Sequence, residues 1–159
     1  MSAVVIGVGN RYRGDDRVGL VIAEEVRARI PSGVATVVCE EEPSRLIDDW
    51  QGASTAIVVD AVASAHEPGA VQRFDASSDD LPAEAFRSST HAFGVAETIE
   101  LARALGRLPQ RLLVYGVAGV EFRAGAGLTP AVREAVESTA VAILHDLEED
   151  DRARARSDE

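Results

Sequence analysis

Short, almost wholly apolar runs alternate with helical patterns along this chain of 159 residues. The first run is "AVVIGVG" (3–9), a later one is "TAIVVDAV" (55–62), and "RLLVYGVAGV" (111–120) closes the series. Strands that are apolar on both faces are typical of a parallel sheet covered by helices on both sides. The pattern therefore predicts an α/β protein, a three-layer α/β/α sandwich with a mostly parallel, twisted sheet of about five strands.

The rest of the chain supplies the other elements of such a fold. A second strand is predicted at 34–39, and the more polar, alternating stretch 69–76 is typical of an edge strand. Helices are predicted where apolar residues recur at helical spacing or where proline can begin a helix, namely over 18–30, 43–50, 95–105 and from Pro130 onward with Thr129 as its cap. We expect a single domain over 1–147 and a charged, disordered tail over 148–159.

Composition narrows the possible partners and compartments. The formal net charge of −11 opposes binding to nucleic acid or to an anionic membrane surface, because both repel such a chain. Cys39 is the single cysteine, which excludes an internal disulfide and a thiolate zinc cage, and its place at the end of an apolar run favours burial. No run is long enough to span a membrane and no secretory signal is evident, so we expect a cytoplasmic protein; a monomer is compatible with this, but the oligomeric state stays open.

The loop "GVGNRYRGDDRVG" (7–19) is the most unusual stretch of the chain. It begins like a dinucleotide-binding turn, but Tyr12 stands where the third glycine of that fingerprint would fall. Asp15 and Asp16 would also place negative charge at the start of the following helix, where the pyrophosphate of a dinucleotide would bind. The acidic residues 40–42 after the second strand could still bind a ribose, so a Rossmann-type nucleotide enzyme remains an alternative.

Three polar side chains are expected to meet at one edge of the sheet. Asp60 ends the apolar part of a buried strand, Asp16 follows the first strand, and His91 opens the helix after a long loop, with a cap among residues 88–90. The carboxyl ends of parallel strands form the ligand crevice of open α/β sheets. Two carboxylates and an imidazole are a ligand set that suits nickel or zinc. The simpler alternatives are that Asp15 or Asp16 stabilises the helix dipole, that Asp60 caps a turn, and that His91 is an ordinary helix residue.

Three segments together resemble the hydrogenase maturation proteases. These are "VVIGVGNRYRGDDRVGLVIAEEV", "AIVVDAV" and "STHAFGVAETIELARALGRLP", and the resemblance extends to about Leu147. The family consists of endopeptidases that remove a C-terminal extension from the large subunit of NiFe hydrogenase. Its fold is phosphorylase/hydrolase-like, a twisted five-stranded sheet between helices, and agrees with the elements predicted above.

The resemblance implies a site and a partner. In the family, an acidic residue of the first loop, an aspartate after the third strand and a later histidine contact the metal, and these match Asp16, Asp60 and His91. The implied partner is the large-subunit precursor. The implied metal is nickel, which the precursor carries and which reports that it is ready for cleavage. A nickel-binding checkpoint protein without hydrolytic activity would use the same ligands and stays an alternative.

Two departures from the family pattern concern the site. Many members carry a Gly-Gly-Thr type segment after the second strand, where this chain has "CEEEPSRLI" (39–47). The acid of the first loop is Asp16, where some relatives have the longer glutamate. The first departure leaves the substrate-docking surface, and hence the particular hydrogenase, open.

Overall fold

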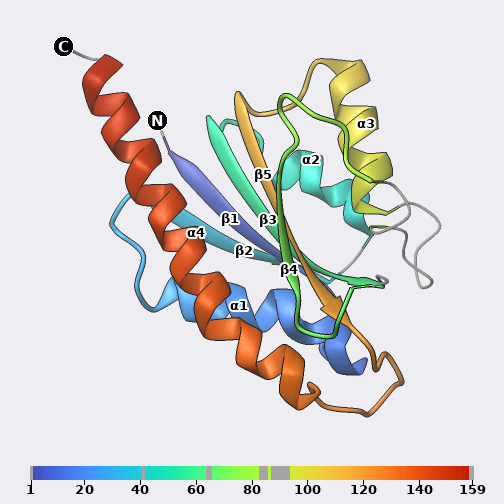
Figure 1. Cartoon of the computed structure of the whole chain (residues 1–159). Helices are drawn as coiled ribbons and strands as arrows, with labels where there is room; N and C mark the ends of the chain where they lie inside the picture. Colours follow the sequence, from blue (N-terminus) through green and yellow to red (C-terminus); the bar gives the residue numbers. More distant parts are fainter. Residues whose placement is uncertain (1, 41, 64–65, 83–85, 87–93, 158–159) are drawn as a thin grey trace.

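A five-stranded sheet forms the centre of the computed structural model, which describes residues 2–40, 42–63, 66–82, 86 and 94–157 (Figure 1). Its strand order is β2-β1-β3-β5-β4. The strands are β1 (Ala3–Val8), β2 (Val34–Cys39), β3 (Thr55–Ala63), β4 (Val71–Asp75) and β5 (Arg111–Gly119). All neighbouring pairs are parallel except β4 with β5. The antiparallel strand β4 lies at one edge, as its alternating polarity predicts.

Helices cover both faces of this sheet. On one face lie α1 (Val18–Arg27) and α4 (Pro130–Ser157), and on the other lie α2 (Leu46–Asp49) and α3 (Val95–Leu105) (Figure 1). Two short 3-10 turns, η1 (Gly14–Arg17) and η2 (Pro43–Arg45), lead into α1 and α2. The α/β/α sandwich predicted from the alternating pattern is therefore confirmed. Along the described residues, none of the helices has the length and hydropathy needed to cross a membrane.

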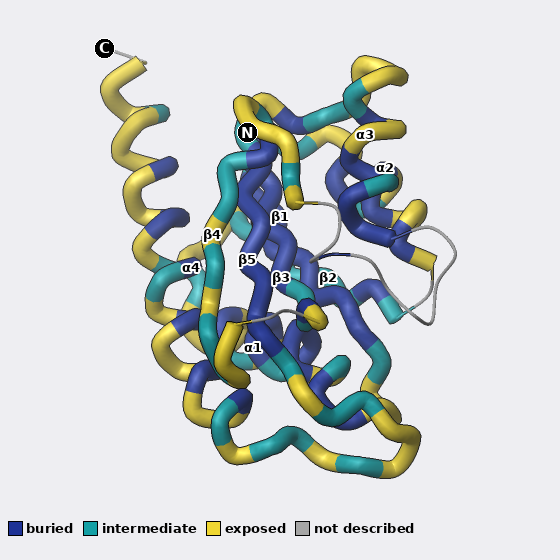
Figure 2. The backbone as a smooth tube through the Cα atoms, turned by 45° about the vertical axis from the view of Figure 1, so that its right-hand side comes forward, coloured by how far each residue is buried: buried dark blue, intermediate teal, exposed yellow. Residues whose placement is uncertain are grey.

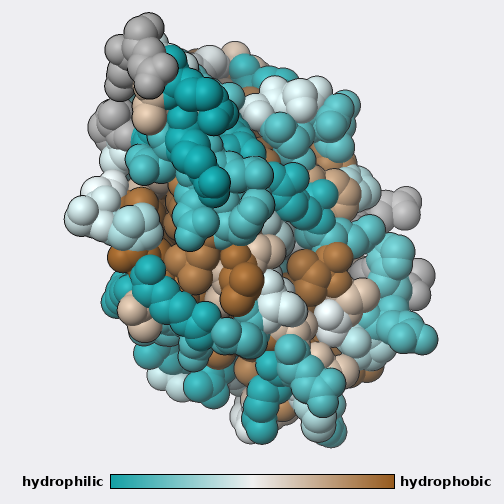
Figure 3. Space-filling model, turned by 60° about the vertical axis from the view of Figure 1, so that its left-hand side comes forward, coloured by the Kyte–Doolittle hydropathy of each residue, from teal (hydrophilic) through white to brown (hydrophobic). Residues whose placement is uncertain are grey.

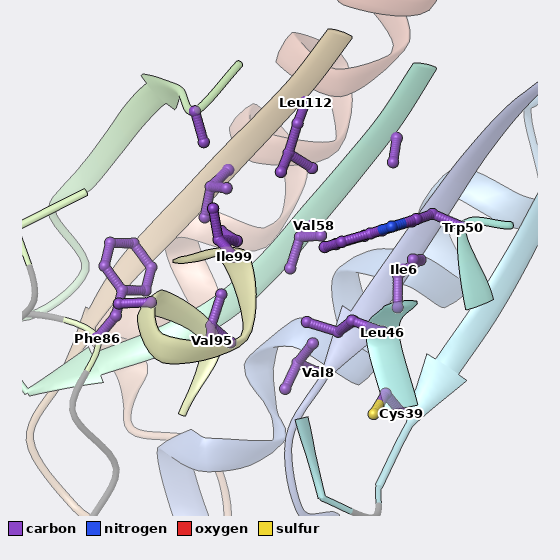
Figure 4. Packing of buried hydrophobic residues seen from close by; sticks show 14 of the residues in the cluster. Ile6, Val8, Cys39, Leu46, Trp50, Val58, Phe86, Val95, Ile99 and Leu112 are labelled. Atoms are coloured by element: carbon purple, nitrogen blue, oxygen red, sulfur yellow. The ribbon is translucent and has the colours of Figure 1, made fainter. Parts of the chain in front are cut away.

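Alternating side chains of the strands divide the core into two layers. In β1, Val4, Ile6 and Val8 pack toward α2 and α3, whereas Ala3 and Val5 pack toward α1 and α4. Figure 2 shows that the central strands are buried along most of their length. Figure 4 shows the first layer, where Trp50 and Leu46 lie against Ile6, Val8 and Val58 of the sheet. Cys39 lies buried at the edge of the same layer, as predicted from its place at the end of β2.

Several element boundaries differ from those predicted. The first helix ends at Arg27 rather than near Ile30, because the backbone tightens there and the Arg29 amide donates to the Val26 carbonyl at 2.9 Å. The third helix begins at Val95 with the extended Gly94 as its cap, so the predicted cap among residues 88–90 was wrong. His91, which was expected to open this helix, lies outside the described residues.

The C-terminal segment differs most from the prediction. Residues 148–157 continue α4 instead of forming a disordered tail. Asp150 is buried there and accepts a hydrogen bond from the Thr55 hydroxyl at 2.7 Å, and Arg111 lies 3.7 Å from the same carboxylate. Thr55 is the first residue of β3 and Arg111 is the first residue of β5, so the sheet holds the C-terminal end of α4. The sequence pattern of charges did not reveal this contact.

Candidate functional site

Two glycines bring the start of α1 directly onto the sheet. A Cβ atom on Gly7 would lie 2.4 Å from the carbonyl oxygen of Gly19, and one on Gly19 would lie 2.3 Å from that of Val8. The same added atom on Gly19 would lie 2.5 Å from the Val59 carbonyl oxygen of β3. Larger residues would push the helix away from both strands. This close approach places η1, which carries the acidic pair of the first loop, against β3.

Asp60 lies where β1 ends and β3 continues. The pairing of β1 with β3 stops at Gly7 and Val59, whereas β3 and β5 stay paired through Asp60 and Gly116 to Gly119. β3 therefore extends three residues beyond Asp60, the residue at which the sequence predicts that the apolar part of this strand ends. Because β1 has ended, the first loop rather than a strand borders Asp60 on that side. The Asp16 carboxylate of this loop is near enough to act on the charge of Asp60, and the metal-binding role of the pair stays a prediction.

The electrostatics of Asp60 reflect this position. Burial of the carboxyl raises its pKa well above the usual range, and the neighbouring Asp16 carboxylate raises that pKa further. The hydrogen bond from the Ala61 amide acts in the opposite direction but is the smaller effect. Two carboxyl groups in a partly buried setting disfavour each other's charge. Such a pair gains from a nearby cation, which offsets both the burial and the repulsion.

Asp15 has a different role from its neighbour. It is fully buried, and its carboxylate accepts hydrogen bonds from the backbone amides of Val120 (2.9 Å), Glu121 (3.0 Å) and Thr129 (2.8 Å). The Thr129 hydroxyl donates to the same carboxylate at 3.0 Å. Burial raises the pKa of Asp15, but these hydrogen bonds outweigh it and lower that pKa below its usual value. Asp15 therefore connects the first loop to the start of α4, and it is Asp16 that is left facing Asp60.

Backbone hydrogen bonds connect the same two loops on either side of Asp15. The Asp15 amide donates to the Glu121 carbonyl at 2.6 Å, the Gly14 amide to Ala126 at 3.0 Å, and the Gly125 amide to Tyr12 at 2.8 Å. Within the first loop, the Asn10 amide donates to the Asp16 carbonyl at 3.1 Å. The backbone that carries Asp16 is therefore fixed from two directions. The sequence analysis missed the contribution of residues 120–129, for which the run "GLTP" after a glycine-rich loop was the available signal.

A second contact joins the first loop to the segment that departs from the family pattern. The guanidinium of Arg11 binds the carboxylate of Glu40 through two hydrogen bonds, of 2.6 and 2.5 Å. The backbone amide of Gly9 donates to the Cys39 carbonyl at 3.2 Å just beneath it. The acidic stretch after β2 thus begins with a residue that binds the loop. Glu40 is an internal ion-pair partner here rather than a ligand for a ribose.

The third predicted ligand cannot be placed with the other two. His91 lies outside the described residues, so the convergence of all three side chains stays a prediction. Among the residues that the structure does describe, no group of three or more histidine, cysteine, aspartate or glutamate side chains is close enough to hold a metal ion. Asp16 and Asp60 are therefore the described part of the candidate site.

The family model for HycI, hydrogenase maturation protease, matches residues 41–146. This chain belongs to the hydrogenase maturation proteases. It is 28% identical over 153 residues to the hydrogenase 2 maturation protease of Escherichia coli K12, covering 94% of this chain and 92% of that protein. It is 30% identical over 138 residues to the hydrogenase expression/formation protein HupD of Bradyrhizobium diazoefficiens, covering 84% and 71% of the two chains.

Solved structures agree with this assignment. The hydrogenase-maturating endopeptidase HybD of E. coli superposes with a TM-score of 0.78 at 26% identity, and the match covers 94% of each chain. The NiFe hydrogenase maturation protease HycI of Thermococcus kodakarensis shares the fold, with a TM-score of 0.73 at 21% identity over 92% of each chain. Like the rest of its family, this protease is an endopeptidase of hydrogenase maturation. Family membership decides against the nucleotide-binding alternative.

Proposed function

We propose that this protease removes the C-terminal extension of a NiFe hydrogenase large-subunit precursor after nickel insertion, and that Asp16, Asp60 and His91 contact the nickel held by that precursor. Its place in the maturation protease family supports the reaction and the substrate class. The nickel belongs to the substrate in this proposal, and the protease reads its presence.

The juxtaposition of Asp16 and Asp60 carries the proposal. Both carboxylates lie where β1 gives way to the first loop, and each makes the other's charge unfavourable. A divalent cation presented by the precursor would relieve that repulsion, whereas a precursor without metal would meet it in full. The pair therefore favours binding of the loaded precursor over the empty one.

Hydrolysis requires a water molecule, a base and a polarised carbonyl group. In this proposal, a carboxylate of the pair accepts the proton of the attacking water. Nickel at the scissile bond would act as a Lewis acid on the carbonyl oxygen or on that water. The backbone of the first loop holds Asp16 in place during this step, because the Asn10 amide donates to the Asp16 carbonyl and the 120–129 loop binds the neighbouring residues Gly14 and Asp15.

The test is cleavage of a nickel-loaded precursor by the purified protease. Mass spectrometry should show a loss equal to the C-terminal extension, and the same precursor without nickel should stay intact. Asp16→Asn and Asp60→Asn should each lower the cleavage rate at least about a hundredfold. Asp80→Asn, at an exposed loop position, is the matched control and should cleave at the wild-type rate.

Each other outcome contradicts a named part of the proposal. A stable complex with an intact precursor would favour the non-hydrolytic checkpoint. Wild-type turnover in Asp16→Asn or Asp60→Asn would remove that residue from the site. Equal cleavage with and without nickel would remove the metal from recognition.

A further inference from the structure

A groove of about 430 Å³ lies between α1, α4 and the loop that Asp15 holds. We call it the Arg17 groove. Figure 1 shows α4 running past α1, and the two helices pack together on the same face of the sheet. The groove is lined by two arginines and by apolar side chains from these elements, among them Arg17, Val21, Leu128, Arg133 and Val136. The proposed function uses none of these residues.

The acidic residues of the groove already have a partner. Glu25 and Glu137 both line it, and both bind the guanidinium of Arg29, at 3.2 Å and at 2.9 and 2.6 Å. One guanidinium offsets one of these two negative charges. Together, Arg17, Arg133 and Arg29 carry three positive charges against the two negative charges of the glutamates, which already bind Arg29.

Arg17 and Arg133 are exposed, and neither forms an ion pair with any described residue. The Arg133 guanidinium instead lies 3.5 Å from the Leu128 carbonyl oxygen. The chain contains 16 basic residues against 27 acidic ones, and most of its described arginines do have a carboxylate partner. Two arginines without an ion pair among the described residues therefore line the same groove of an acidic protein.

The groove combines these charges with an apolar surface. Val21, Leu128 and Val136 contribute aliphatic side chains, and Val136 is almost fully buried. Figure 3 views the side of the molecule that carries α4 and shows small apolar patches among hydrophilic side chains. A guanidinium is a planar donor that matches a carboxylate with two parallel hydrogen bonds. The chemistry of the groove thus fits a carboxylate with an aliphatic or aromatic side chain next to it.

We propose that the Arg17 groove binds the terminal carboxylate of the precursor's C-terminal extension, with the last side chain of the extension on the apolar surface. This proposal rests on the proposed function, because it names how the same substrate docks. Arg17 directly follows Asp16, so the groove begins one residue from the candidate site. The terminal carboxylate is the one anion that every extension carries, whatever its sequence.

Direct binding tests the proposal without any cleavage. A fluorescent peptide that copies the extension of the large-subunit precursor from the same organism is titrated with the protease in two forms, free acid and C-terminal amide. The free acid should bind about fivefold more tightly, the difference expected for one exposed charge pair. Equal affinity of the two forms would overturn the proposal and would point to an acidic side chain of the peptide or to no docking here.

Charge-neutralising variants locate the site. Arg17→Gln and Arg133→Gln should each remove the preference for the free acid. Arg107→Gln is the matched control, because Arg107 is also exposed and without an ion pair among described residues but lies after α3, on the other face of the sheet. A preference that survives in both groove variants, or that is lost equally in the control, would overturn the proposal.

Kinetics then separate this proposal from the proposed function. With the nickel-loaded precursor, Arg17→Gln and Arg133→Gln should raise KM about fivefold and leave kcat within about twofold of wild type. An unchanged KM in both variants would contradict binding of the extension in the Arg17 groove, but it would not contradict the proposed cleavage. Failure of the wild-type protease to cleave counts against the proposed function, and the peptide titration still decides on the groove.

Discussion

The Asp15 carboxylate accepts hydrogen bonds from both the backbone amide and the hydroxyl of Thr129, 114 residues further along the chain. This contact joins the loop after the first strand to the cap of the last helix. It also explains why two adjacent aspartates have different roles. Asp15 is enclosed by donors and holds the structure together, whereas Asp16 is left with Asp60 as a charged neighbour.

Replacing Asp15 by asparagine should destabilise the protein strongly. The described partners of its carboxylate are all donors, so the amide group of asparagine would place a donor against donors in a buried site. We expect a loss of about 3 kcal/mol in the free energy of unfolding, measured by urea denaturation. Thr129→Ser keeps the hydroxyl and is the control, with a loss below about 1 kcal/mol. A similar stability of Asp15→Asn and wild type would contradict the structure around Asp15.

The same carboxylate should make stability depend on pH in the acid range. Its pKa is lower in the folded protein than in the unfolded chain, so its stabilising contribution is present above the unfolded value and is lost as pH falls through the folded value. The unfolded value is about 3.9, so the loss should begin near pH 4 and increase below it. Denaturation curves across this range should show a shallower pH dependence for Asp15→Asn than for wild type.

Neutralising Asp60 should have the opposite effect on stability and abolish activity. Its pKa is raised in the folded protein, so its contribution is favourable below the unfolded value and is lost as pH rises through the folded value. At neutral pH, Asp60→Asn should therefore be more stable than metal-free wild type by about 1 kcal/mol. This advantage should shrink as pH falls toward 4. If Asp60→Asn were less stable than wild type at neutral pH, the ionised Asp60 carboxylate would not destabilise the folded protein.

Removing the charge of Asp16 should change the titration of its neighbour. The Asp16 carboxylate is one of the two causes that raise the pKa of Asp60. In Asp16→Asn, carboxyl NMR should find a lower pKa for Asp60 than in wild type, although burial will keep it above the usual value. An unchanged Asp60 pKa would show that the two carboxylates do not interact.

A buried polar cluster should hold α4 to the sheet. Asp146 is buried on this helix and accepts hydrogen bonds from Arg73 of β4, at 2.9 and 3.2 Å, and from the Tyr115 hydroxyl of β5. Asp146→Ala should lower the free energy of unfolding by about 3 kcal/mol, because it leaves the Arg73 charge without its partner. Tyr115→Phe removes one hydrogen bond and should cost about 1 kcal/mol. Equal losses of unfolding free energy in Asp146→Ala and Tyr115→Phe, measured by thermal or urea denaturation, would contradict this arrangement.

The cluster also has a spectroscopic consequence. Burial raises the pKa of the Tyr115 hydroxyl, and its hydrogen bond to Asp146 raises it further. In an alkaline absorbance titration, Tyr115 should stay protonated above the range where an exposed tyrosine ionises. Tyr115→Phe should remove that late step from the titration curve.

The sequence alone determined the class of fold and most of its elements. Apolar runs such as 3–8 and 55–59 bury both faces, which requires a parallel sheet between helices, and Pro130 after Thr129 fixes where the last helix begins. It also indicated that Asp16 and Asp60 share one edge, because parallel strands end there together. These inferences depend on local patterns and on the geometry of sheets.

The tertiary structure decided what local patterns cannot encode. It gave Asp15 partners from residues 120–129, and it made residues 148–157 helical because Asp150 binds Thr55 at the far end of the sheet. Charged residues without periodicity are typical of a solvated tail, and only the fold shows that some of them have buried partners. The difference between Asp15 and Asp16 follows from the same physical reason: donors around a carboxylate stabilise its charge, whereas a second carboxylate beside it disfavours that charge.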